Sequence, residues 1–231
     1  MGDELAEVLL FHHVQGLTDG VRALADAIRA AGHTVHTPDL FGGETYQSID
    51  EGFSAMQALG PGAFDVAADA AFADLPPALV YAGISLGVMS AQRLAQTREG
   101  ARGSVLLEAC VPPSEYGDSW PRGVPVQVHG MDHDPFFGLE GDLDAAGELV
   151  ATVDDGELVV HPGDVHLFTD SSLPSHDAEP HDTCSSASSH FWSGSDVDSP
   201  RSGWRQGRGT VVATGHPAAL LTGRVSKDEA R

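Results

Sequence analysis

A serine between two glycines is the first feature of the sequence that could do chemistry. In the segment VYAGISLGVMS, Ser85 follows an apolar run at residues 78–82 and precedes a helical pattern at residues 88–96. A serine on a sharp strand-to-helix turn projects its hydroxyl above the sheet and can act as a nucleophile. The same serine could instead cap the helix with its side chain, so this segment alone leaves both interpretations open.

A serine needs a base that accepts its proton and a third group that orients the base. Two later segments supply such groups, each directly after a strand-like run. QVHGMDHDPFF contains Asp132 and Asp134, and LVVHPGDVHLF contains His161 and His166. We favour His166 as the base, because it lies in a loop beyond the strand end and loops can bend over a site.

The elements that must position these residues alternate along the chain. Strand-like runs alternate with helical patterns, and the runs lie at residues 7–12, 34–40, 78–82, 103–109, 124–130 and 157–163. One helical pattern, at residues 48–75, is interrupted at Gly60-Pro61-Gly62. This alternation predicts an α/β fold with a mostly parallel sheet covered by helices on both faces. In such sheets the active site lies beyond the carboxyl ends of the strands, where all the candidates above fall.

Composition divides the chain into two parts. Residues 178–231 carry six acidic and six basic side chains, whereas the whole excess of negative charge lies in residues 1–177. The second part is rich in serine, glycine and arginine and has no sustained apolar period. We therefore expect one domain over residues 1–177 and a loosely attached, disordered tail over residues 178–231.

The overall charge and the cysteine content exclude several classes of protein. The chain has 231 residues and a formal net charge of −22, which disfavours nucleic acid and anionic membranes as partners. Its two cysteines do not indicate a disulfide framework, and no apolar run is long enough to span a membrane. We expect a cytoplasmic protein that is a monomer or a small homo-oligomer.

Four segments together resemble the dienelactone hydrolase family of α/β-hydrolases. They are FHHVQGLTDGVRALADAIRAAGHTVHTPDLFGG, YAGISLGV, PVQVHGMDHDPFF and HPGDVHLFTDSS. The resemblance implies that Ser85 is the nucleophile, Asp134 the orienting acid and His166 the base. It leaves Asp132 as the second choice for the acid, and it implies an oxyanion hole formed by the amides of Val14 and Leu86.

Two residues depart from the best-known members of the family. Those enzymes use a cysteine nucleophile where this chain has Ser85, and a glutamate after the first strand where it has His13. Their substrate-binding arginines have no clear counterpart, so a small neutral ester or lactone is the expected substrate. His13, Phe41 and Trp120 are candidate residues for lining the substrate pocket.

The resemblance also bears on the tail. Similar proteins end in an amphipathic helix soon after the histidine loop, and this sequence lacks one. A shifted reading frame over residues 182–192 can encode such a helix, so we hypothesise that the tail is a frameshift product.

Other kinds of chemistry have weaker support. The chain has twelve histidines, but none of their spacings is a helical His-x-x-x-His with a catalytic glutamate, so we expect neither metal nor cofactor. Cys110 lacks the flanking glycines of a nucleophile and is expected to be a small buried residue. The alternative function is a catalytically silent α/β-hydrolase scaffold that binds a small molecule or another protein.

Overall fold

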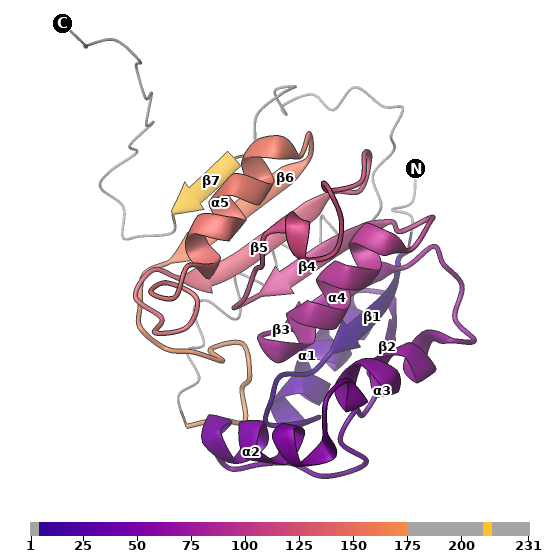
Figure 1. Ribbon diagram of the computed structural model, residues 1–231, viewed down its shortest axis with the longest axis vertical. Helices are drawn as coiled ribbons and strands as arrows, with labels where there is room; N and C mark the ends of the chain where they lie inside the picture. Colours follow the sequence, from indigo (N-terminus) through magenta and orange to yellow (C-terminus); the bar gives the residue numbers. More distant parts are fainter. Residues whose placement is uncertain (1–4, 175–209, 214–231) are drawn as a thin grey trace, which may run out of the picture.

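Short apolar strands form the centre of the molecule (Figure 1). The computed structural model describes residues 5–174 and 210–213. Within these residues, seven strands form one sheet in the order β2-β1-β3-β4-β5-β6-β7, and each neighbouring pair is parallel. The strands are Glu7–Phe11 (β1), Thr34–His36 (β2), Val80–Ile84 (β3), Gly103–Leu107 (β4), Val126–Met131 (β5), Gly156–His161 (β6) and Thr210–Ala213 (β7).

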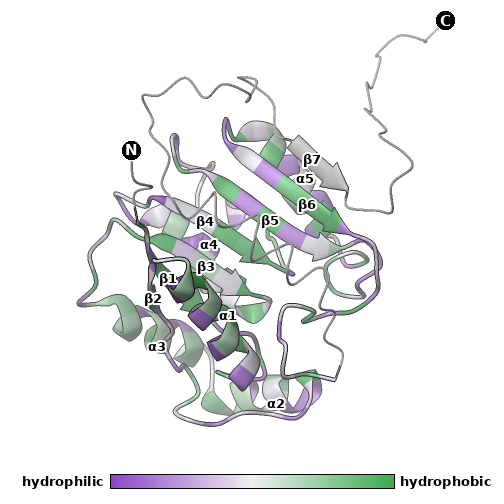
Figure 2. Ribbon diagram, turned by 180° about the vertical axis from the view of Figure 1, so that it is seen from behind, coloured by the Kyte–Doolittle hydropathy of each residue, from purple (hydrophilic) through white to green (hydrophobic). Residues whose placement is uncertain are grey.

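Helices cover both faces of the sheet because alternate strand residues point to opposite sides. They are Asp19–Ala30 (α1), Ile49–Leu59 (α2), Ala63–Phe72 (α3), Leu86–Thr97 (α4) and Asp142–Thr152 (α5), with a short 3-10 turn at Pro113–Glu115. Leu9, Phe11 and Tyr81 pack in one apolar cluster with α3, α4 and α5. Val8 and Leu10 pack in a second cluster with α1, which lies on the opposite face (Figures 1 and 2).

The helix boundaries follow local signals in the sequence. Thr18 caps α1 by accepting a hydrogen bond from the Val21 amide, and α1 ends before Gly32, which has a φ of 104°. The predicted break at residues 60–62 is confirmed, because α2 ends at Leu59 and α3 begins at Ala63.

The predicted parallel sheet with helices on both faces is confirmed. One element was not predicted: β7 lies in the part of the chain for which we expected no order, and it pairs with β6. The rest of the tail, and with it the frameshift hypothesis, lies outside the described residues. Among the described residues, no helix combines the length and apolar character needed to cross a bilayer.

Candidate active site

Ser85 lies on a sharp turn between β3 and α4. Its backbone has a φ of 47° and a ψ of −114°, a conformation that costs a non-glycine residue free energy. The turn is held by the Ser85 amide, which donates to the Leu107 carbonyl oxygen at 2.8 Å. The Ser85 side chain makes no capping hydrogen bond to α4. Ser85 therefore lies on a sharp strand-to-helix turn, the kind of turn that presents a nucleophile in other proteins, and its side chain does not cap α4.

The flanking glycines are required by close contacts between backbones. A Cβ atom on Gly83 would lie 2.4 Å from the carbonyl carbon of Gly87, and one on Gly87 would lie 2.4 Å from the Phe11 carbonyl oxygen. These distances are far below ordinary van der Waals contact. The glycines thus allow α4 to begin directly against β1 and β3, which sets the sharpness of the turn at Ser85.

Ser85, His166 and Asp134 form a chain of hydrogen bonds at the carboxyl edge of the sheet. The Ser85 Oγ lies 2.9 Å from the His166 Nε2, and the His166 Nδ1 lies 2.7 Å from the Asp134 Oδ2. The second carboxylate oxygen of Asp134 accepts the Phe136 amide at 2.8 Å. The three residues follow β3, β6 and β5, so the parallel sheet brings them to one edge from distant parts of the sequence.

This arrangement suits proton transfer from the serine. Asp134 is an acceptor, so the His166 Nδ1 carries the hydrogen and the His166 Nε2 can accept the Ser85 proton. Burial opposes a charge on His166, but the hydrogen bond to Asp134 and the charges of Glu108, Asp134 and Asp142 outweigh it. The pKa of His166 is therefore raised above its ordinary value of 6.5.

Asp132 is turned away from His166. Its carboxylate contacts the His133 Nδ1 at 2.6 Å and accepts the Gly163 amide at 3.0 Å. The side chain is 38% exposed, whereas Asp134 is fully buried. Of the two acids that the sequence offered, the structure thus brings Asp134 and not Asp132 to the histidine.

The two amides expected to form an oxyanion hole follow neighbouring strands at the edge of the sheet that carries Ser85. Leu86 is the first residue of α4, where backbone N–H groups have no partner within the helix. Val14 lies in the loop that follows β1, the strand next to β3. In the described part of the chain, neither amide donates a hydrogen bond to another protein group. Both are thus available to a ligand oxygen.

His13, a candidate for lining the substrate pocket, is held among polar partners. It is fully buried, with its Nε2 atom 2.7 Å from the Asp170 Oδ2 and its Nδ1 atom accepting the Gln15 amide at 3.2 Å. The Thr18 hydroxyl also donates to the Asp170 carboxylate. His13 therefore helps to hold the loop after His166 against the loop after β1.

Asp170 is a structural residue that sequence analysis missed. Burial disfavours its charge, but the hydrogen bonds from His13, Ser172 and Thr18 outweigh burial and lower the pKa of Asp170 to about 2. It lies only four residues after His166 in the segment HLFTDSS, yet its partner His13 is 157 residues away in the sequence. No sequence pattern links such distant residues.

The two predicted aromatic residues occupy different places. Phe41 lies at the carboxyl edge, where its ring is buried against His12 and Phe64 with centroid distances of 5.2 and 5.9 Å. Trp120 is buried in the core, and its indole nitrogen donates to the Val124 carbonyl oxygen just before β5 begins. Trp120 thus lies toward the opposite edge of the sheet, and the structure does not bring it to Ser85.

Phe136 is the aromatic residue that contacts the base. Its ring centroid lies 4.5 Å from that of His166. The sequence analysis did not single it out, although it stands two residues after Asp134. Its position two residues after Asp134 in the sequence could have identified it, because the turn that orients Asp134 also brings the Phe136 ring against the imidazole.

The remaining candidates for other chemistry are buried. Burial, with a further contribution from the Asp142 charge, raises the pKa of the Cys110 thiol to about 12, so the thiol is protonated at neutral pH. His129 and His161 stack with a centroid distance of 5.7 Å, and burial lowers the pKa of His129 to about 3. Among the residues the structure describes, no group of three or more histidine, cysteine or acidic side chains is arranged to hold a metal ion.

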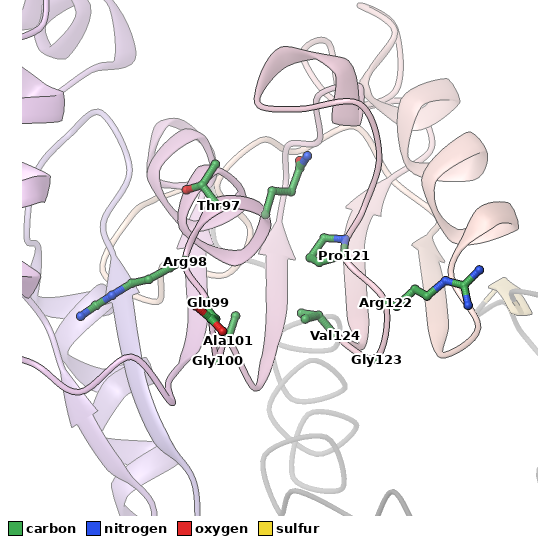
Figure 3. Close-up of a pocket in the computed structure, with 10 residues that line it drawn as sticks. Thr97, Arg98, Glu99, Gly100, Ala101, Pro121, Arg122, Gly123 and Val124 are labelled. Atoms are coloured by element: carbon green, nitrogen blue, oxygen red, sulfur yellow. The ribbon is translucent and has the colours of Figure 1, made fainter.

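A cavity of about 390 Å³ lies at the amino-terminal edge of the sheet, opposite the site (Figure 3). Residues 96–101 and 121–124, which precede β4 and β5, line it. Figure 3 shows the side chains of Arg98 and Arg122 extending away in opposite directions. The Arg98 guanidinium instead donates to the Leu75 carbonyl oxygen and lies over the Phe72 ring. The cavity has no link to the chemistry at Ser85.

The strand order and the positions of Ser85, Asp134 and His166 define an α/β-hydrolase fold. Among solved structures, the chain is similar to a dienelactone hydrolase-like promiscuous phosphotriesterase from metagenomic libraries. The identity is 20% and the TM-score 0.65, and the match covers 84% of this chain and 87% of that one. The esterase domain of a Rhodothermus marinus protein matches with 13% identity and a TM-score of 0.51, covering 83% and 87%.

A cold-adapted esterase from an Arctic intertidal metagenomic library is a third similar structure, with 17% identity, a TM-score of 0.50 and coverage of 82% and 83%. No protein-family profile and no curated protein sequence matches the chain. At these identities the similarity establishes the fold. The predicted resemblance to dienelactone hydrolases is thus confirmed at the level of three-dimensional structure.

Proposed function

We propose that this protein is a serine hydrolase that cleaves small carboxylic esters or lactones. The observation that carries the proposal is the unbroken chain of hydrogen bonds from Ser85 through His166 to Asp134. The names of the similar structures, which include esterases, support the same class of reaction. The expected substrates are neutral, because residues 1–177 carry a large excess of negative charge.

The reaction follows from the positions of the three side chains. The Ser85 Oγ attacks the carbonyl carbon of the ester as its proton passes to the His166 Nε2, and the carbonyl oxygen becomes an oxyanion held by the amides of Val14 and Leu86. The ester C–O bond then breaks, and His166 gives its proton to the departing alcohol. Asp134 stabilises the imidazolium in both steps without taking its proton.

Water completes the cycle. A water molecule loses a proton to the His166 Nε2 and attacks the acyl carbon, and the bond between the acyl carbon and the Ser85 Oγ breaks as that proton returns to the Ser85 Oγ. The carboxylic acid leaves, and the hydrogen-bonded triad is restored. Atoms and charges balance without a cofactor.

Hydrolysis of p-nitrophenyl acetate and butyrate tests this proposal. We expect turnover that Ser85→Ala abolishes and that Asp134→Asn reduces by about 10³–10⁴-fold, since the wrong imidazole tautomer is then favoured. Ser90→Ala is a matched control, because Ser90 is a buried serine in α4 whose Oγ has no hydrogen-bond partner among the described residues. That variant should keep its activity.

A fluorophosphonate probe gives a second readout that does not depend on the choice of ester. It should label the protein at Ser85, and Ser85→Ala should remove the label. If no short acyl ester is hydrolysed and the probe does not react, the proposal is wrong and a non-catalytic binding scaffold is the better description.

A further inference from the structure

Glu108 is a buried carboxyl group in the centre of the site that the proposed reaction does not use. It directly follows β4, which lies between the strand that leads to Ser85 and the strand that leads to Asp134. Its amide donates to the His129 carbonyl oxygen at 2.7 Å, and the residue is fully buried. A buried carboxyl is costly unless it is paired, so its presence here calls for a role.

The side chain of Glu108 holds the loop that carries the base. One oxygen, Oε1, accepts hydrogen bonds from the Thr169 amide at 2.9 Å and from the Thr169 hydroxyl at 2.7 Å. Thr169 is three residues after His166. In the described residues the other oxygen, Oε2, has no hydrogen-bond partner. The contact with Thr169 therefore accounts for only one of the two carboxyl oxygens.

The backbone of Glu108 has a positive φ, as does the backbone of Ser85. Among the described residues, three non-glycine residues have a positive φ, and they are Ser85 at 47°, Glu108 at 65° and Leu167 at 60°. They follow β3, β4 and the histidine, so strained backbone is concentrated at this edge of the sheet. Such strain persists where the surrounding structure fixes a functional geometry.

We propose that Glu108 is a positioning residue for His166: it anchors the histidine loop through Thr169, and its negative charge favours the imidazolium that forms during the reaction. Glu108 is buried and acts through His166, so it does not touch the substrate. The proposal deepens the hydrolase function and rests on it for the catalytic consequence, whereas the effect on His166 exists in the resting protein.

Several charged groups act on the same imidazole. Asp134 bonds the His166 Nδ1 from the loop after β5, Asp142 acts from the first turn of α5, and Glu108 acts from the end of β4. On Glu108 itself, burial raises the pKa above its ordinary value, and the charges of His166 and His13 and the two hydrogen bonds from Thr169 oppose that rise without cancelling it. The carboxyl and the imidazole are thus coupled, and each favours the charged form of the other.

Two variants separate the charge of Glu108 from its anchoring role. Glu108→Gln removes the charge but keeps an oxygen that can accept both Thr169 hydrogen bonds. Thr169→Val removes the hydroxyl donor but keeps the charge and the shape of the side chain. If the charge acts on His166, only Glu108→Gln should change the protonation of the imidazole.

The direct measurement is the titration of the His166 imidazole by NMR, with its signal assigned by its loss in His166→Gln. We expect Glu108→Gln to move this titration to lower pH than in the wild type, and Thr169→Val to leave it in place. An unchanged titration in Glu108→Gln, or an equal shift in both variants, would overturn the proposal. Glu108→Asp, which keeps the charge, should titrate like the wild type. Glu108→Ala, which lacks the charge, should shift as Glu108→Gln does and replaces that variant if it does not fold.

The rate of ester hydrolysis supplies the catalytic readout. Glu108→Gln should lower kcat by about tenfold with little change in KM, since a charge that stabilises the transition state is lost while the substrate surface is intact. Its pH–rate profile should move in the same direction as the NMR titration. A shifted titration in a protein that hydrolyses no ester would refute the proposed function and leave the link between Glu108 and His166 intact. Normal ester hydrolysis with an unshifted titration in Glu108→Gln would support the proposed function and refute the link between Glu108 and His166.

Discussion

Gly87→Ala is the substitution that tests the nucleophile elbow most directly. The added Cβ atom would lie 2.4 Å from the Phe11 carbonyl oxygen and 2.7 Å from that of His12. Both are backbone atoms, one at the end of β1 and one in the residue after it, so they cannot rotate away. To bring the shorter contact to 3.0 Å, α4 must move by at least 0.6 Å.

Two opposing terms set the effect on stability. Overpacking of this kind costs about 1–3 kcal/mol, while the gain in helix propensity from glycine to alanine is at most about 1 kcal/mol. With the full propensity gain we therefore expect a net loss of up to about 2 kcal/mol, which lowers the urea midpoint by up to about 1 M at an ordinary denaturant slope. The first turn of α4 carries the Leu86 amide, so ester hydrolysis should fall by about 10- to 100-fold.

Gly147→Ala is the matched control. Gly147 also lies within a helix, α5, but a Cβ atom added there would have no neighbouring atom within 4 Å. The same substitution should therefore raise stability by up to about 1 kcal/mol and leave hydrolysis unchanged. Equal urea midpoints and equal activities for the two alanine variants would refute the steric account of the elbow.

Three further predictions concern ionisable groups. The kcat/KM of ester hydrolysis should fall with decreasing pH through a pKa above 6.5, because protonated His166 cannot accept the Ser85 proton. A kinetic pKa at or below 6.5 would contradict the role of the acidic neighbours of His166. Asp170, with a pKa lowered from 3.8 to about 2, should stabilise the fold above pH about 4. That contribution should disappear as the pH falls toward 2, so Asp170→Asn should flatten the pH dependence of the unfolding free energy over this range. In a Cys184→Ser background, iodoacetamide at pH 8 should leave Cys110 unmodified in the native protein and modify it in urea, because burial raises the thiol pKa to about 12.

Local signals in the sequence were sufficient to predict the helices and strands up to β6 and the sharp turn at Ser85. Examples of such signals are the apolar run before Ser85, the Thr18 cap and the glycines around residue 60. Each of these signals acts over only a few residues, so the sequence alone reveals it. The chain order of serine, acid and histidine also followed from the sequence, since parallel strands bring their carboxyl ends to one edge.

The pairing of the side chains, in contrast, depends on the three-dimensional fold. Asp132 and Asp134 are two residues apart in one loop, and the local turn directs the first to His133 and the second to His166. The residue types in this loop do not indicate which of the two is buried, and only the family resemblance favoured Asp134.

Sequence analysis did not predict the partners of His13 and Glu108 for the same reason, because these contacts join distant parts of the chain. His13 bonds Asp170 across 157 residues, and Glu108 bonds Thr169 across 61. Each of these contacts depends on the order of strands in the sheet, which places chain segments side by side that share no local pattern. Periodicity and capping therefore predict where an element lies, whereas packing between distant loops decides which polar groups meet at the site.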